Sequence, residues 1–200
     1  EDQLNIVKSD KDAVYSQEMD FDITDMEPQI ACPNDVDNVC DISKIEGTSI
    51  DQCLIGSCTN GRLEDLMAAA EILKGKKVAP FVKLIVTPAS RKIYTEAMEN
   101  GTMDILVKAG AIITHPSCGL CCGRTGGILT DGETVVATNN RNFLGRSGTK
   151  DADVYLVSPE TAAISALTGV LTDPRTIGEM PEFVLPEKFT VNDNMIGLPA

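Results

Sequence analysis

The segment Gln52-Cys53-Leu54-Ile55-Gly56-Ser57-Cys58-Thr59-Asn60-Gly61 passes from an apolar run into a loop that is bounded by glycines and carries a cysteine. The run 52–56 predicts a short buried strand. The residues after the loop repeat at helical spacing, which predicts a helix that Asn60 or Thr59 caps and that Gly75 ends. The repeating residues are Leu63, Leu66, Met67, Ala70 and Leu73. A strand, a tight loop and a helix in this order are typical of α/β folds.

Strands and helices continue to alternate beyond this unit. The sequence predicts further strands over 81–87, 111–114, 134–138 and 154–157, and helices over 89–99, 102–109 and 160–168. This alternation predicts an α/β fold with a three-layer α/β/α arrangement around a mostly parallel sheet.

Charge divides the chain into unequal parts. The formal net charge is −13; residues 1–50 contain 13 acidic residues and 3 lysines, whereas residues 51–200 contain 17 acidic and 14 basic residues. We predict three parts: an acidic segment over 1–50 that leads into the fold or ends a preceding domain, an α/β domain over 51–173, and an irregular tail over 174–200. Within the first part, residues 31–50 predict a loop. Because the chain begins at Glu1 rather than Met, we expect a piece of a longer polypeptide or a processed product.

Composition excludes several classes of partner. The acidic charge argues against nucleic acid and anionic membrane surfaces, because both attract clustered Lys and Arg. No run approaches the roughly 18 apolar residues of a membrane-spanning helix. The chain has seven cysteines, and an odd number without a secretory signal segment favours a reducing cytoplasm. We expect Cys53 to be buried in its strand, and Cys32 and Cys40 to have no special role.

Three other cysteines lie just beyond predicted strands. Cys58 follows the strand 52–56, and Cys118 and Cys121 form a C-x-x-C after the strand 111–114. Loops at the carboxyl ends of parallel strands meet at one edge of a sheet, so we expect these thiols to converge. Their chemistry leaves four uses open. These are an iron–sulfur cluster with three protein ligands and one open iron, a closed zinc site with His115 or Cys122 as the fourth ligand, a redox C-x-x-C pair, and inert thiols.

A segment rich in arginine and amides follows the predicted strand 134–138. It reads Asn139-Asn140-Arg141-Asn142-Phe143-Leu144-Gly145-Arg146. Arginine binds carboxylates through two parallel N–H···O bonds, so Arg141 and Arg146 predict a small polycarboxylate ligand beside the cysteines. The alternative is a pair of ordinary surface arginines bonded to Asp131 or Asp151.

Taken together, the motifs resemble a known family. Ile55–Gly61, Cys118–Cys121 and Asn140–Arg146 resemble three motifs of the aconitase superfamily, and Glu27–Pro33 and Ser158–Ala163 extend the resemblance. Within the superfamily, the chain is most similar to the large subunits of 3-isopropylmalate dehydratase and homoaconitase. The resemblance implies that this is the cluster-bearing domain, of the aconitase domain 3 type, from the C-terminal part of such a subunit.

That resemblance also implies roles for individual residues. The three converging cysteines match the ligands of a [4Fe–4S] cluster with one open iron, which purification in air can remove. Arg141 and Arg146 match arginines that bind substrate carboxylates, and Asn140 matches an asparagine at the cluster edge. Cys122 departs from the small or aliphatic residue expected at its position. His115 carries no role from the family, whereas Arg124, just after the second cysteine loop, is placed to meet the negative charge of substrate or cluster.

The activity implied by the resemblance is that of a hydro-lyase, which isomerises 2-isopropylmalate and 3-isopropylmalate by dehydration and rehydration in leucine biosynthesis. Homoaconitase, or another dehydratase of a substituted malate, is the alternative substrate class. A non-catalytic iron–sulfur sensing module and a zinc-stabilised interaction domain are alternatives of other classes. The chain has a single histidine, so the acid–base residues are expected in preceding domains and in a small, swivelling-domain subunit. We therefore expect no catalytic acid or base in this chain, and no activity from it alone.

Overall fold

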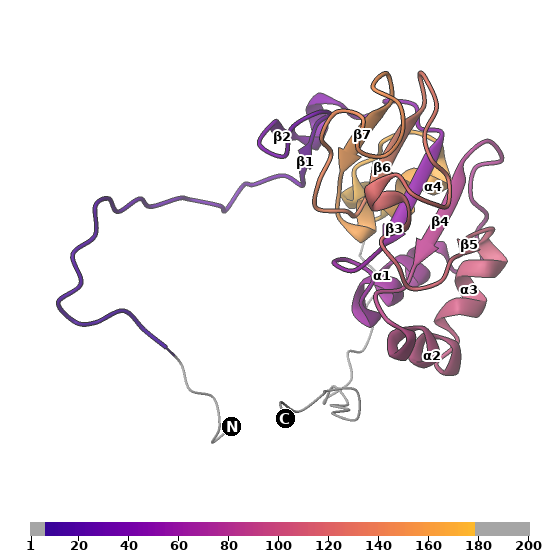
Figure 1. The fold of residues 1–200 in the computed structure, drawn as a ribbon, viewed down its shortest axis with the longest axis horizontal. Helices are drawn as coiled ribbons and strands as arrows, with labels where there is room; N and C mark the ends of the chain where they lie inside the picture. Colours follow the sequence, from indigo (N-terminus) through magenta and orange to yellow (C-terminus); the bar gives the residue numbers. More distant parts are fainter. Residues whose placement is uncertain (1–6, 179–200) are drawn as a thin grey trace.

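A seven-stranded sheet forms the centre of the computed structural model, which describes residues 7–178. The sheet order is β2-β1-β7-β6-β3-β4-β5, and Figure 1 shows β7, β6, β3, β4 and β5 side by side across the body. Strands β3 to β7 pair in parallel, whereas β1 is antiparallel to both β7 and β2. The predicted α/β fold with a mostly parallel sheet is therefore confirmed. The strands are β1 Gln29–Ala31, β2 Val39–Asp41, β3 Gln52–Gly56, β4 Lys83–Thr87, β5 Ile112–Ile113, β6 Thr134–Ala137 and β7 Asp153–Leu156.

All four α-helices in the described residues cover the same face of this sheet. They are α1 Leu63–Leu73, α2 Arg91–Glu99, α3 Thr102–Ala109 and α4 Pro159–Thr168. Helix α1 contacts the other three, and buried residues of all four pack with Cys53 and Ile55 of β3 in one core cluster. Side chains alternate along a strand, so Leu54 faces the opposite side. There it packs with Leu120 and Leu129.

The layer on that opposite side differs from the predicted helical one. It consists of the irregular chain that connects β5 to β6, and its helical part is the short 3-10 helix η2, Gly119–Cys122. Two further 3-10 turns are η1, Ile42–Lys44, and η3, Pro174–Ile177. The cysteine loop thus lies in the layer where a doubly wound fold would place helices.

The N-terminal quarter holds more structure than predicted. The expected loop over 31–50 was wrong in part, because β2 and η1 lie within it. The β1–β2 hairpin precedes residue 51 in the sequence and adds two strands to the sheet next to β7. Ile30 and Ile42 are fully buried in the main core. Strands of three residues are too short to give a periodic pattern, which explains the difference.

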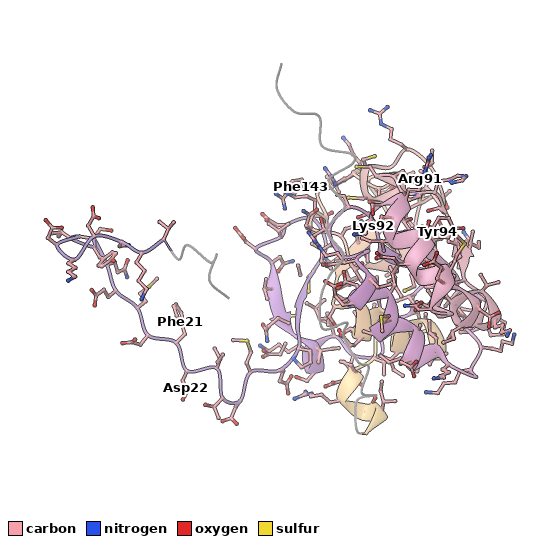
Figure 2. All side chains as sticks on the ribbon, turned by 90° about the horizontal axis from the view of Figure 1, so that it is seen from below. Phe21, Asp22, Arg91, Lys92, Tyr94 and Phe143 are labelled. Carbon is pink, nitrogen blue, oxygen red and sulfur yellow. The ribbon has the colours of Figure 1, made fainter. Side chains whose placement is uncertain are left out.

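The segment before β1 leads away from the body in an extended form (Figure 1). Figure 2 shows Phe21 and Asp22 on this segment, away from the sheet, and three quarters of the Phe21 surface is exposed. Of the predicted irregular tail, the structure describes only residues 174–178, and the remainder lies outside the described residues. No described helix is long and apolar enough to cross a membrane.

Candidate functional site

The first cysteine sits on a sharp left-handed turn at the carboxyl end of β3. Gly56 has φ +114° and Ser57 has φ +73°. The Ser57 N–H donates to the Thr87 carbonyl at 2.8 Å, and a Cβ on Gly56 would collide with that same carbonyl oxygen. Only glycine fits so close to the neighbouring strand. The turn brings the Cys58 thiol to the surface at this edge of the sheet.

Thr138, directly after β6, fastens this turn to the neighbouring loop. Its hydroxyl accepts the Gly56 N–H at 2.8 Å, and its carbonyl accepts the Asn60 side-chain amide at 2.7 Å. The predicted helix cap at residues 59–60 was therefore wrong. Helix α1 begins after Arg62 instead, whose N–H donates to the Asp65 carboxylate at 3.0 Å.

The second cysteine loop follows β5 on the face of the sheet opposite the α-helices. The Cys121 N–H donates to the Cys118 carbonyl at 2.9 Å, which closes the turn of η2. Gly123 ends it with φ +62°. Cys118 is exposed, Cys121 is buried and Cys122 is half-buried. The Cys122 thiol lies 3.6 Å from the Gly119 carbonyl, so it stays within its own loop.

Cys118 lies within electrostatic range of all three thiols around it. Its pKa is raised by the charge of Cys122 first, and then by the charges of Cys58 and Cys121. Cys58 is 60 residues away in sequence from Cys118 and comes from a different strand. Both loops lie against the end of β4, because the Ser57 N–H donates to the Thr87 carbonyl and a Cβ on Gly119 would lie 3.8 Å from the Thr87 hydroxyl oxygen.

A zinc ion and an iron–sulfur cluster require different spacings between their cysteine ligands. Within residues 7–178, no three His, Cys, Asp or Glu side chains are arranged to hold one metal ion. A zinc site needs its sulfurs around one atom, at about 2.3 Å each. In a [4Fe–4S] cluster each thiolate binds a different iron, so the ligands stand farther apart.

Buried polar groups without partners accompany this edge of the sheet. The Ser57 hydroxyl and both amide atoms of Asn139 are buried and bond to nothing in the described part of the chain. They follow the neighbouring parallel strands β3 and β6. Buried polar atoms are usually paired, so their presence here is consistent with a polar group that completes the site.

Arg146 is held against the second cysteine loop. Its Nε donates to the Cys121 carbonyl at 2.8 Å, and its Nη2 lies 3.9 Å from the Cys121 sulfur. Gly123 permits this contact, because a Cβ there would lie 2.5 Å from the Arg146 carbonyl oxygen. These two contacts fix the arginine side chain relative to the Cys121 loop.

Asn140 and Arg141 are exposed on the same loop, after β6. The Arg141 Nη1 donates to the Asn140 carbonyl at 2.5 Å. Neither Arg141 nor Arg146 forms an ion pair with an acid among the described residues, which disfavours the surface-pair alternative with Asp131 or Asp151. Both guanidinium groups therefore lack a carboxylate partner in this part of the chain, and that of Arg146 lies against Cys121.

Asn142 has a structural function that the sequence did not indicate. It is 1% exposed, and its amide donates to the carbonyls of Cys32 at 2.6 Å, Asp35 at 3.2 Å and Val154 at 3.4 Å. One side chain therefore ties the arginine loop to the β1–β2 hairpin and to β7. A lone asparagine in a loop gives no periodic signal, so only the fold could show this.

His115 and Arg124 lie at the margin of the site, and both are exposed. His115 lines a surface cavity of about 500 Å³ together with Tyr94, Ser117 and Thr125. This cavity borders the second cysteine loop but is lined by no cysteine.

Comparison with known sequences decides the family. The sequence model of the aconitase family (aconitate hydratase) matches residues 42–169. This chain belongs to the aconitase family. The match includes both cysteine loops and the arginine loop of this aconitase-family chain, and begins at η1.

Named relatives of this aconitase-family chain are large subunits. It is 54% identical over 172 residues to 3-isopropylmalate dehydratase large subunit 1 of Archaeoglobus fulgidus, covering 86% of this chain and 41% of the relative. It is 56% identical over 171 residues to the probable methanogen homoaconitase large subunit of Methanosarcina mazei, covering 86% and 43%. It is 49% identical over 170 residues to the homoaconitase large subunit of Thermus thermophilus, covering 85% and 41%. The chain thus spans about two fifths of the length of these relatives.

Proposed function

We propose that this chain is the cluster-bearing part of the large subunit of a hydro-lyase that interconverts 2-isopropylmalate and 3-isopropylmalate. The observation that carries the proposal is the convergence of Cys58 with the Cys118–Cys121 loop, beside Arg146. The relative from Archaeoglobus fulgidus, a 3-isopropylmalate dehydratase large subunit, supports the substrate.

In this proposal Cys58, Cys118 and Cys121 hold the [4Fe–4S] cluster through three of its irons. When bound, the cluster supplies an open iron that acts as a Lewis acid on the leaving hydroxyl group. The exposure of Cys58 and Cys118 leaves this side of the site accessible to substrate. Asn140, which is exposed on the loop after β6, would lie at the edge of the cluster.

Arg141 and Arg146 bind and orient the carboxylates of the substrate. Arg146 uses Nε and Nη2 toward Cys121 and keeps further N–H donors of its fork for a carboxylate. Arg141 is anchored at one Nη1 by the Asn140 carbonyl, which limits the positions of its guanidinium group. A substrate held by both arginines has its reacting carbons placed beside the cysteines.

The proton transfers belong to other parts of the enzyme in this proposal. The chain covers about two fifths of its relatives, and its one histidine is exposed at the margin of the site. We assign the acid–base residues to the preceding domains and to a small subunit, and expect this chain alone to be inactive. All seven cysteines are free thiols, which supports the cytoplasm as the compartment.

Homoaconitase is the second candidate, because the Methanosarcina mazei relative of that name is 56% identical. Both reactions need the same cluster and the same arginines, so the difference lies in the side group of the substrate. Kinetics of the complete large subunit with its small subunit decide between them. A preference for isopropylmalate supports the first proposal, and a preference for homoaconitate supports the second.

Anaerobic reconstitution with iron and sulfide tests the cluster itself. The chain should bind about four irons and four sulfides and turn brown. Serine variants of Cys58, Cys118 and Cys121 should each lower the iron content sharply, whereas Cys122→Ser serves as the matched control. One zinc per chain without sulfide would overturn the cluster. A stable cluster without turnover in the complete enzyme would favour the sensing module.

A further inference from the structure

The β1–β2 hairpin carries a pair of thiols that is separate from Cys58, Cys118 and Cys121. The sulfurs of Cys32 and Cys40 lie 3.3 Å apart and share a hydrogen bond. Both side chains are half-buried. The Cys32 N–H donates to the Asn38 carbonyl at 2.7 Å, which continues the ladder of the hairpin beyond β1. Cys32 lies one residue beyond β1, and Cys40 lies on β2 opposite Ile30, so the two sulfurs meet diagonally across the hairpin.

We propose that Cys32 and Cys40 form a reversible disulfide by exchange with a small-molecule disulfide. A thiolate of Cys40 attacks the small disulfide, forms a mixed disulfide and releases one small thiolate. Cys32 then loses its proton and attacks the Cys40 sulfur, which closes the protein disulfide and releases the second small thiolate. The sulfurs must approach from 3.3 Å to about 2.05 Å, a change that small side-chain rotations can supply.

The surroundings assign the two steps to different sulfurs. Burial first, and then the hydrogen bond with Cys40, raise the pKa of Cys32 to about 11, so its proton is retained at neutral pH. Lys44 pairs with Asp41 at 2.8 Å. The pKa of Lys44 is raised by that bond and charge first, and further by the charge of Cys40. The ammonium group therefore lies within electrostatic range of Cys40.

The β1–β2 hairpin is bonded to the loop that carries Arg141 and Arg146, so a disulfide in the hairpin can affect that loop. The Asn142 amide donates to the Cys32 carbonyl at 2.6 Å and to the Asp35 carbonyl at 3.2 Å. Asn34 and Phe143 form an isolated β-bridge. A disulfide that stiffens residues 32–40 is therefore expected to restrict the loop that carries Arg141. This second part rests on the proposed function.

Peptide mapping by mass spectrometry tests the disulfide. The cluster of the 200-residue chain is first reconstituted, which protects Cys58, Cys118 and Cys121. The protein is then equilibrated in mixtures of reduced and oxidised glutathione and alkylated. We expect a Cys32–Cys40 linked peptide without retained glutathione. Cys32→Ser should instead retain glutathione on Cys40, and Cys122→Ser should behave as the unchanged chain. No linkage at any ratio, or a linkage that forms only in urea, would overturn the proposal.

Stability and exchange measurements separate the disulfide from its effect on the site. Closing a loop of about nine residues should shift the unfolding equilibrium roughly 50- to 100-fold toward the folded state. Hydrogen exchange of the amides of 139–147 should slow on oxidation, and Asn142→Ala should abolish that slowing. An unchanged exchange rate would refute the coupling while the disulfide stands. Failure of the proposed hydro-lyase activity would leave both results intact.

Discussion

Replacing Gly56 by alanine tests the turn that presents the first cysteine. Gly56 has φ +114°, a conformation that side chains rarely adopt, and an added Cβ would collide with the Thr87 carbonyl oxygen. The backbone must then shift away from β4. That shift breaks the Ser57 N–H bond to Thr87 and strains the Gly56 N–H bond to Thr138, both 2.8 Å long.

These terms add up to a large loss of stability. The conformational strain costs about 1–3 kcal/mol, and each weakened hydrogen bond about 0.5–1.5 kcal/mol. We expect Gly56→Ala to lower the free energy of unfolding by about 2–6 kcal/mol. Gly75 is a matched control, because it has φ +70° and a Cβ added there would meet no atom within 4 Å. Gly75→Ala should cost only about 1–2 kcal/mol.

Urea denaturation of both variants measures the difference, and iron content after anaerobic reconstitution measures the displacement of Cys58. Gly56→Ala should lose both stability and iron, whereas Gly75→Ala should keep its iron. Equal losses of stability in the two variants would refute the argument from the close approach to Thr87. Full iron content in a destabilised Gly56→Ala chain would refute the claim that this turn positions Cys58.

Three further predictions concern the arginine, core and C-terminal contacts. Arg146→Lys removes the hydrogen bond from Nε to the Cys121 carbonyl and the planar guanidinium group. KM in the complete enzyme should therefore rise about 10- to 100-fold with the fold intact. An unchanged KM would contradict the role of Arg146 in binding substrate carboxylates. Cys53→Ala should lower the free energy of unfolding by about 1–2 kcal/mol without loss of iron, since this thiol is fully buried in the core; a loss of iron would contradict the ligand assignment. The hydrogen bond from Arg175 holds the pKa of Asp173 below its ordinary value. The resulting stability is present above pH about 4 and is lost as the pH falls further. Acid titration should show this loss in the unchanged chain and not in Arg175→Met.

The periodic elements of this fold were predictable because their patterns are local. The strand 52–56 has the predicted bounds, and helix α1 contains the predicted repeat from Leu63 to Leu73, although it begins after Arg62 rather than after residues 59–60. The short strands β1 and β2 were not predictable in this way. Their three residues each form strands because β7 and the buried Ile30 stabilise them. The side of the sheet that each connection covers was likewise decided by packing.

The site shows the same division. The positions of the cysteines and arginines directly after predicted strands indicated that they form one site, because parallel strands bring their carboxyl ends to a common edge of the sheet. The predicted helix cap at Asn60 was wrong, since the Asn60 side-chain amide donates to the Thr138 carbonyl instead of capping helix α1. The hydrogen bonds of the Asn142 amide could not be predicted from the sequence, because the three carbonyls that accept them belong to distant segments.

By itself, the sequence determined the α/β alternation, the chemistry of the sulfur and guanidinium groups, and the resemblance to the aconitase family. These depend on residue types and on spacing along the chain. Only the tertiary structure decided that all four described α-helices share one face, that Arg146 lies against Cys121, and that two thiols in the hairpin are in contact. Contacts between segments far apart in sequence depend on how the strands pair, and strand pairing leaves no local pattern in the sequence.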